Sequence, residues 1–155
     1  MDEKVGWHTI ATSPEATERL AEKLGRQLHG GEVIELISDL GGGKTTFVRG
    51  LARGAGSSDV VASPTFTISK LYIADRFEIH HFDFYRLQES GIMADEIAEV
   101  VGDPHAVVVI EWGDVVAHVL PAERMTIHIT QTPDGNRNLR FEAPAKLHYL
   151  LEGLK

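Results

Sequence analysis

The chain has 155 residues, a length that suits one domain able to bury about 70% of its unfolded surface, so we expect residues 1–155 to form a single domain. It contains no cysteine, which excludes disulfides, thiolate zinc sites and cysteine nucleophiles and fits a reducing compartment. Fifteen basic residues against 23 acidic ones give a formal charge of −8, which argues against tight, autonomous binding to nucleic acid.

The N-terminus is charged and no apolar segment follows it, so we expect no secretory leader. The longest unbroken apolar run, 106–110, is far too short to span a bilayer. These features predict a soluble, cytoplasmic protein with no membrane partner.

A helix is expected from Ser13 to the glycines at 30–31. Ser13 suits the N-cap, Pro14 suits the first helical position, and an acidic residue follows in the first turn. Leucines at 20, 24 and 28 recur every four residues, which predicts one apolar stripe along this helix.

The next segment predicts a strand, a glycine-rich turn and a helix. An apolar run at 33–37 precedes Ser-Asp-Leu-Gly-Gly-Gly-Lys-Thr-Thr at 38–46, and a helical apolar pattern follows. Backbone N–H groups of such a turn, at a helix N-terminus, bind phosphate. We expect Lys44 to reach the β/γ-phosphates and the Thr45 hydroxyl to hold Mg²⁺. The expected nucleotide-binding residues are Asp39, Leu40, Gly41, Gly42, Gly43, Lys44, Thr45 and Thr46.

One position departs from the P-loop pattern G-x-x-x-x-G-K-[ST], because Ser38 stands where the pattern has its first Gly. A serine can end a strand at negative φ, so the loop is compatible with this residue. The competing interpretation is a glycine-rich turn before an ordinary helix that carries an exposed lysine. The strand, turn and helix in this order argue against it.

The rest of the chain shows mostly strand patterns. The expected elements are a loop at 57–65, strands at 68–73, 77–84 and 106–110, a helix at 94–101, a hairpin of 125–132 with 138–143, and a terminal helix at 146–154. The apolar, β-branched run at 106–110 is typical of a strand buried on both faces. A Pro-Asp-Gly-Asn turn at 133–136 favours the hairpin.

Two acidic residues end predicted strands. Glu111 directly follows the run at 106–110, and Asp83 lies at the end of the strand at 77–84. A P-loop site needs an acid on a neighbouring strand that faces Mg²⁺, an ion that prefers oxygen ligands. We interpret Glu111 as a metal ligand. With two carboxylates at one site, one can bind the metal while the other orients or deprotonates the attacking water. The sequence leaves open which carboxylate has which role.

Four residues near these acids have two interpretations each. Ser63 and Thr65 lie on a loop whose hydroxyls sense the γ-phosphate or its metal in nucleotide switches, or they belong to a plain turn. Trp112 packs over the site or anchors the core. His81 and Asp83 share a strand face, which suits a transition metal, but no third ligand is evident. A hydrogen-bonded histidine is the alternative.

Four motifs, taken in order, resemble one family. They are Asp-Leu-Gly-Gly-Gly-Lys-Thr-Thr at 39–46, Ser-Pro-Thr-Phe-Thr at 63–67, His-Phe-Asp-Phe-Tyr-Arg-Leu at 81–87 and Ile-Glu-Trp at 110–112. This order is similar to that of the TsaE (YjeE-like) family, small bacterial ATPases of tRNA N6-threonylcarbamoyladenosine synthesis. The resemblance runs from about Ser13 to about Phe141.

The resemblance implies an α/β fold, a three-layer P-loop NTPase-type domain with a mostly parallel central sheet and a C-terminal antiparallel hairpin. It implies hydrolysis of ATP with Mg²⁺ beside the proteins TsaD and TsaB, with tRNA contacted only through that complex. The implied roles are phosphate binding by Lys44 and Thr46, Mg²⁺ binding by Thr45 and Glu111, hydrolysis by Asp83 with Glu111 and Lys44, a switch-like loop at Ser63 and Thr65, and Trp112 flanking the site.

Other functions use the same loop. A small P-loop kinase acting on a nucleoside or another small molecule is the main alternative, although no arginine-rich lid appears between Glu111 and the terminal hairpin. A GTPase lacks its guanine-reading Asn/Thr-Lys-x-Asp motif here. A third possible function is that of a scaffold whose binding state depends on the nucleotide and whose hydrolysis is incidental. No arginine finger is obvious, with Arg49, Arg86 and Arg140 as candidates, so we expect slow turnover without partners.

Overall fold

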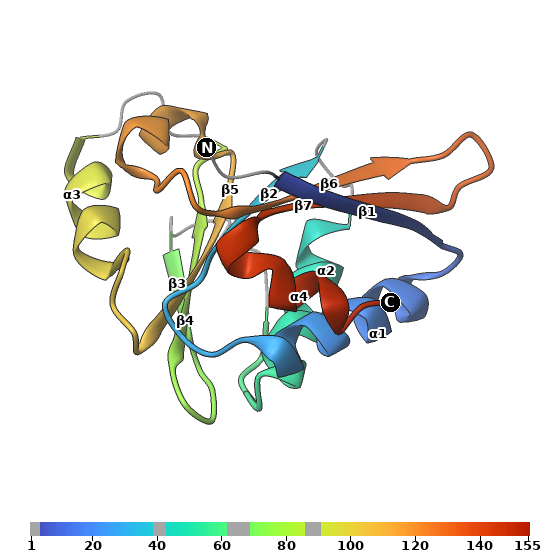
Figure 1. Cartoon of the computed structure of the whole chain (residues 1–155), viewed down its shortest axis with the longest axis horizontal. Helices are drawn as coiled ribbons and strands as arrows, with labels where there is room; N and C mark the ends of the chain where they lie inside the picture. Colours follow the sequence, from blue (N-terminus) through green and yellow to red (C-terminus); the bar gives the residue numbers. More distant parts are fainter. Residues whose placement is uncertain (1–3, 39–42, 62–68, 86–90) are drawn as a thin grey trace.

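The computed structural model describes residues 4–38, 43–61, 69–85 and 91–155, apart from the side chain of residue 92. The elements in chain order (Figure 1) are β1 (Lys4–Ala11), α1 (Pro14–Gln27), β2 (Val33–Ser38), α2 (Lys44–Gly54), β3 (Ser69–Ile73), β4 (Glu78–Asp83), α3 (Gly91–Val100), β5 (Ala106–Glu111), the 3-10 helix η1 (Gly113–Val119), β6 (Met125–Gln131), β7 (Arg137–Pro144), the 3-10 helix η2 (Ala145–Leu147) and α4 (His148–Glu152).

The described strands form one seven-stranded sheet in the order β1-β7-β6-β2-β5-β4-β3. Its central strands β6, β2, β5 and β4 are parallel to one another. Strands β1, β7 and β3 pair antiparallel with their neighbours. The expected α/β fold and the hairpin β6–β7 are confirmed, and the parallel strands form the centre of a mixed sheet.

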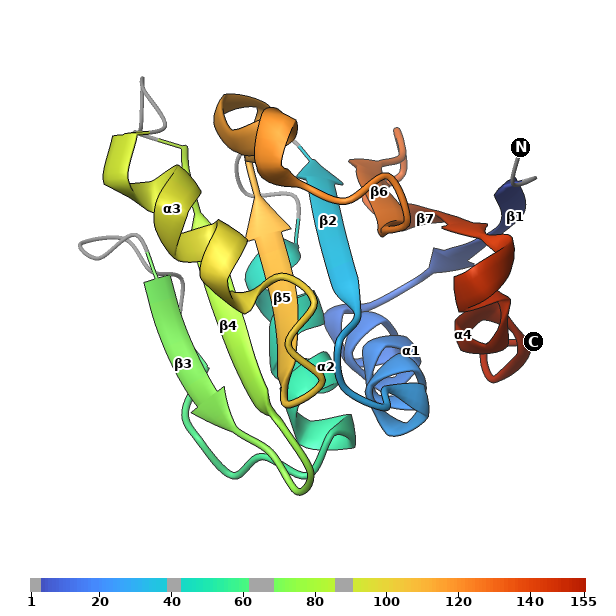
Figure 2. The same ribbon diagram turned by 60° about the vertical axis from the view of Figure 1, so that its left-hand side comes forward.

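Helices cover both faces of the sheet, which confirms the three-layer arrangement. Figure 2 shows α1 and α2 behind the central strands and α3 in front of them. Strand β5 is buried along its whole length, as its apolar run predicts. Val107 and Val109 pack in the core with α1 and α2, whereas Val108 and Ile110 pack in the core with α3 and η1. Side chains that alternate along β5 therefore pack into two separate cores, one on each face of the sheet.

Helix α1 begins as its sequence predicts. The N-cap Ser13 accepts a hydrogen bond from the Ala16 N–H at 3.0 Å, and Pro14 is the first helical residue. This cap satisfies one of the N–H groups that a helix start leaves without a partner. None of the helices in the described ranges has the length and apolar character needed to cross a membrane.

Strand β1 is an addition to the expected elements. Its residues alternate between exposed and half-buried, and Trp7 packs on Phe141 with ring centroids 5.7 Å apart. The antiparallel register pairs Ala11 with Arg137, the first residue of β7. Because Ser13 follows Ala11 closely, this pairing brings the start of α1 beside the hairpin.

The carboxyl ends of the parallel strands β2, β5 and β4 meet at one edge of the sheet. Leu36 of β2 is in register with Glu111 of β5, and Glu111 is in register with Asp83 of β4. Ligands of open α/β sheets bind at this edge. Strand β2 ends at Ser38 at this same edge, so the end of β2 and the two acids share one end of the molecule.

Helices α1 and α2 pack closely because glycines line their contact. A Cβ added to Gly50 would lie 2.3 Å from the Glu18 carbonyl oxygen, and one added to Gly54 would lie 2.1 Å from the Glu22 carbonyl oxygen. Real Cβ atoms essentially never approach backbone that closely. The glycines therefore set the distance between the two helices, and with it the position of the start of α2.

We predict that Gly50→Ala lowers the free energy of unfolding by about 1–3 kcal/mol, because the added methyl group forces the two helices apart. In an open helix the same change stabilises by roughly 1 kcal/mol. Urea denaturation measures the difference, with Arg19→Ala on the exposed side of α1 as the control that stays within about 0.5 kcal/mol. A stabilised Gly50→Ala variant would contradict this account of the helix contact.

Candidate functional site

The described ends of β2 and α2 lie as expected on either side of a phosphate-binding turn. Strand β2 ends at Ser38, and α2 begins at Lys44 with Gly43 as its N-cap. Gly43 has φ +98°, a conformation that side chains other than glycine rarely adopt. A glycine cap offers no side-chain acceptor to the first-turn N–H groups, which leaves them to an anion. Residues 39–42, where Asp39, Leu40, Gly41 and Gly42 were expected to bind nucleotide, lie outside the described residues.

Lys44 is drawn back over this junction instead of extending into solvent. Its side chain is buried, with 7% of its surface exposed. The Nζ lies 3.4 Å from the Ser38 carbonyl oxygen, to which it donates, and 5.1 Å from the centroid of the Trp112 ring. An exposed lysine on an ordinary helix, the competing interpretation of the sequence, does not describe this residue.

The two acids lie side by side but in different surroundings. Glu111 is buried, whereas Asp83 is partly exposed. Burial raises the pKa of Asp83 above its ordinary value; the hydrogen bond from the Tyr85 N–H opposes this, and the negative charge of Glu111 adds to it. Lys44 acts on the same carboxyl group and lowers its pKa. Lys44 and the two acids therefore form one electrostatic group around Asp83.

Trp112 lies at the site, not in the core. Its backbone has φ +57°, the single positive value of a residue other than glycine among the described residues. Such a conformation costs about 1–3 kcal/mol. The ring is 36% exposed and contacts Tyr85, with centroids 5.1 Å apart. This backbone turns the chain directly after Glu111, so that the indole lies beside Lys44.

His81 is a buried, hydrogen-bonded residue. Its Nε2 is 2.5 Å from the Glu111 Oε2, and its Nδ1 is 3.2 Å from the Tyr72 hydroxyl. With both ring nitrogens engaged, no nitrogen is left for a metal ion. No group of three or more His, Asp or Glu residues able to hold a metal occurs in the described ranges. These contacts favour the hydrogen-bonded interpretation of His81 over the transition-metal interpretation.

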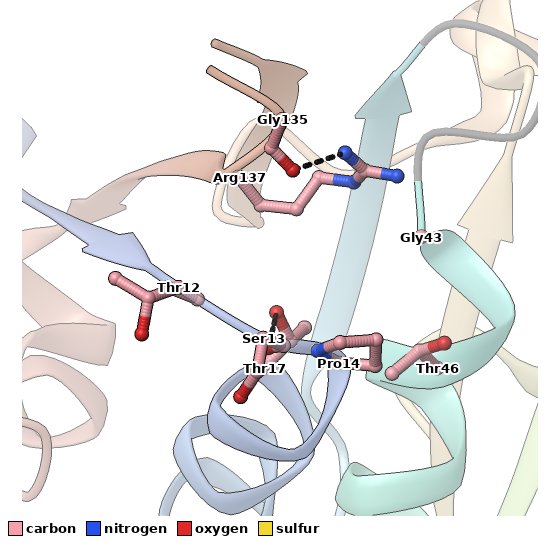
Figure 3. A pocket seen from close by; sticks show the side chains of 9 residues that line it. Thr12, Ser13, Pro14, Thr17, Gly43, Thr46, Gly135 and Arg137 are labelled. Atoms are coloured by element: carbon pink, nitrogen blue, oxygen red, sulfur yellow. Dashed lines mark hydrogen bonds between the residues drawn. The ribbon is translucent and has the colours of Figure 1, made fainter.

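A cavity of about 120 Å³ lies against the start of α2. Figure 3 shows its walls, which come from the junction of β1 and α1, from α2 and from the β6–β7 hairpin. The lining residues are Ala11, Thr12, Ser13, Pro14, Thr17, Gly43, Thr46, Gly135 and Arg137. Small-molecule sites usually measure about 300–1,000 Å³, so this cavity fits one part of a nucleotide and not the whole.

Arg137 is the charged residue of this cavity. Its Nη1 donates to the Gly135 carbonyl oxygen at 3.4 Å, and its Nε would lie 3.5 Å from a Cβ on Gly43 (Figure 3). The sequence named Arg49 and Arg140 as candidates, but they pair with Glu18 and Glu142 on the surface. Arg86 is outside the described residues. A turn signal was the only signal near Arg137, and it carried no hint of a site.

The oxygen donors at this edge of the sheet suit a magnesium ion. Thr45 offers a hydroxyl at the first turn of α2, and Glu111 and Asp83 offer carboxylates at the ends of adjacent strands. Hydroxyl, carboxylate and water oxygens are the ligands that Mg²⁺ prefers. Ser63 and Thr65, the expected switch-like loop, lie outside the described residues.

Comparisons with known proteins give one family. The family model for "Threonylcarbamoyl adenosine biosynthesis protein TsaE" matches residues 11–139. The chain is 35% identical over 147 residues to the tRNA threonylcarbamoyladenosine biosynthesis protein TsaE of Bacillus subtilis, covering 94% of this chain and 89% of that protein. The protein of the same name from Treponema pallidum is 38% identical over 130 residues, with 84% and 96% covered. The crystal structure of Bacillus subtilis YdiB matches with a TM-score of 0.78 at 33% identity, over 99% and 95% of the two chains.

We predict that Asp83→Asn does not destabilise the protein at neutral pH. The pKa of Asp83 is raised in the folded state, so the folded protein holds the proton of this carboxyl group more tightly than the unfolded chain does. The stability of the fold therefore falls as the pH rises above 3.8, the ordinary pKa of the group. Asparagine removes this loss and still accepts the Tyr85 N–H bond, whose length is 3.0 Å. The stability of the variant relative to the parent should therefore increase between pH 4 and pH 7 in urea melts.

Asp134→Asn is the control of opposite sign. The hydrogen bond from the Thr132 hydroxyl lowers the pKa of Asp134, so that its carboxylate stabilises the fold above its ordinary pKa. That variant should be less stable than the parent above pH 3.8, and the difference should disappear as the pH falls below 3.8 through the lowered pKa of the folded state. Equal losses for both variants at pH 7 would show that Asp83 is held by contacts other than those described.

Proposed function

Because the chain belongs to the TsaE family, we propose that it binds and hydrolyses ATP with Mg²⁺ in the biosynthesis of tRNA N6-threonylcarbamoyladenosine. The family supports a nucleotide-binding, enzymatic role in this pathway. The observation that carries the ATPase proposal is the meeting of three groups at one sheet edge: the glycine-capped start of α2, the buried Lys44, and the paired acids of β4 and β5. The same arrangement is required for phosphoryl transfer.

The triphosphate would bind across the start of α2. The first-turn N–H groups and Lys44 would hold the phosphates, with the Thr46 hydroxyl beside them. Lys44 already acts electrostatically on Asp83, and its ammonium group would exchange the Ser38 carbonyl for a phosphate oxygen. Asp39, Leu40, Gly41, Gly42 and Gly43 would complete this cradle, as the loop pattern predicts.

Thr45 and Glu111 would hold Mg²⁺, which when bound supplies charge neutralisation on the phosphate oxygens. Asp83 would orient the attacking water or accept its proton. Its partly exposed carboxyl group with a raised pKa suits that role better than the buried Glu111 does. Trp112 would flank the phosphates, since its ring lies over the Lys44 ammonium group.

The base would enter the cavity at the start of α1. Thr12, Ser13 and Thr17 provide polar atoms there, and Pro14 provides an apolar surface for a ring. Arg137 would lie between the base and the phosphates, because its guanidinium is in the cavity and close to Gly43. The size of the cavity fits a base whose phosphates lie outside it on the loop.

The proposed partners are TsaD and TsaB, with tRNA reached only through that complex. This follows from family membership together with the charge of −8, which suits contact with a protein complex better than contact with tRNA. Ser63 and Thr65 would report the state of the γ-phosphate as a switch-like loop. Turnover by the isolated chain should be slow, with the partners completing the site.

The proposed function is tested by reconstitution with TsaD and TsaB. We expect ATP-dependent co-elution and multiple turnovers of tRNA modification with the parent chain. Lys44→Ala should lose about 10- to 150-fold in ATP affinity by calorimetry, because a charged contact of this kind contributes about 1.5–3 kcal/mol. Lys23→Ala, an exposed lysine of α1, is the matched control.

Three results would count against this proposal. Unchanged ATP binding by Lys44→Ala would remove the P-loop assignment. ATP turnover that responds to a nucleoside or sugar acceptor, and not to TsaD and TsaB, would establish the small-molecule kinase instead. An ATP-binding variant without hydrolysis that supports full multiple-turnover modification would favour the scaffold.

We predict that Arg137→Ala weakens ATP binding about tenfold or more while the thermal unfolding midpoint stays within a few degrees. The reason is the loss of the cation next to the phosphate site. Arg140→Ala removes an exposed arginine from the same strand and should bind ATP as the parent does. If both variants bound ATP equally well, the cavity would not be part of the nucleotide site.

A further inference from the structure

A buried hydrogen-bonded pair lies directly beneath the proposed metal site. His81 has none of its surface exposed, and Glu111 has 2%. The Nε2 of His81 and the Oε2 of Glu111 are 2.5 Å apart, a short contact for a nitrogen and a carboxylate oxygen. A carboxylate in such a place costs several kcal/mol unless it is paired, so this contact is a condition for burying Glu111 at all.

The ring of His81 is held at both nitrogens. A carboxylate that serves as a metal ligand only accepts hydrogen bonds, so we assign the proton to the Nε2 of His81, which then donates to Glu111. The Tyr72 hydroxyl, 3.2 Å from Nδ1 and 2% exposed, holds the other side of the ring. The rings of Tyr72 and His81 also pack with centroids 5.9 Å apart. Tyr72, His81 and Glu111 therefore form a chain across β3, β4 and β5.

This chain leaves one side of the Glu111 carboxylate for the site. His81 takes Oε2, and in the part of the chain that the structure describes no hydrogen bond to Oε1 occurs. The strand position fixes the backbone of Glu111 through its register with Asp83 and Leu36. The contact with His81 then fixes the rotation of the Glu111 carboxylate.

We propose that His81 is a positioning residue that orients Glu111 toward the magnesium ion, with Tyr72 holding the ring; this rests on the proposed function. The partner of a metal-binding carboxylate sets its direction, and removing such a partner typically costs 10- to 100-fold in metal affinity. His81 acts through Glu111 and touches neither nucleotide nor metal. A role confined to packing would alter stability without altering the dependence on Mg²⁺.

The test separates donation from packing with two substitutions of one residue. His81→Gln keeps an N–H donor near the position of Nε2, whereas His81→Met fills a similar space without a donor. We expect His81→Met to raise the Mg²⁺ concentration for half-maximal ATP binding and hydrolysis about tenfold or more. Nucleotide binding without metal should be unchanged, and His81→Gln should recover most of the loss.

A second readout needs neither metal nor activity. Nitrogen NMR of the metal-free protein should show the Nε2 of His81 protonated, and Glu111→Gln should shift that proton resonance. A ring with its proton absent from Nε2 would overturn the proposal. So would a folded His81→Met variant with the Mg²⁺ dependence of the parent.

Tyr72→Phe decides the matter if His81→Met does not fold. It removes one hydroxyl and leaves the Glu111 contact in place, so we expect the same change in Mg²⁺ dependence at several-fold magnitude. An unchanged Mg²⁺ dependence in this variant would then overturn the proposal. A parent protein that binds no ATP at any Mg²⁺ concentration would instead overturn the proposed function, whatever the variants do.

Discussion

The pairing register of β2, β5 and β4 is the constraint on which the site depends. It aligns Leu36, Glu111 and Asp83 across three parallel strands, at the edge where β2 ends. Side chains alternate along a strand, so a shift of one residue in β5 would turn Glu111 to the face covered by α3. No local feature of Glu111 itself prevents this. The residues that prevent it lie earlier in the strand.

Burial on both faces prevents the shift. Val107 and Val109 fill one core and Val108 and Ile110 the other, so slipping the strand would have to repack both. A polar side chain is costly to bury in a strand that is covered on both faces. Strand β5 has one such residue, Glu111, at its end. Glu111 is tolerated there because His81 from the adjacent strand supplies its partner. The apolar packing and the buried polar pair thus support the same geometry from two directions.

Features encoded within a short segment could be predicted from the sequence. The strand that ends at Ser38, the helix that begins at Lys44, the cap at Ser13, and the acids at the ends of β4 and β5 all have local signals. Arg137 and the cavity could not be predicted, because the walls come from segments that meet only through the pairing of β1 with β7. Strand β1 was missed because its half-buried face has meaning only once Trp7 is placed on Phe141. The left-handed backbone of Trp112 likewise has no sequence signal, since aromatic residues rarely adopt it.

Ser38, the residue that departs from the P-loop pattern, contacts Lys44 through its backbone. Ser38 ends β2 in extended conformation, and its carbonyl oxygen, not its side chain, accepts from Lys44. A glycine in that position would present the same carbonyl group. The pattern has glycine at this position either because the phosphate lies close to the backbone or because φ is positive. The second reason does not apply to Ser38, because Trp112 is the one residue other than glycine with positive φ among the described residues. The lysine contact itself is indifferent to the substitution.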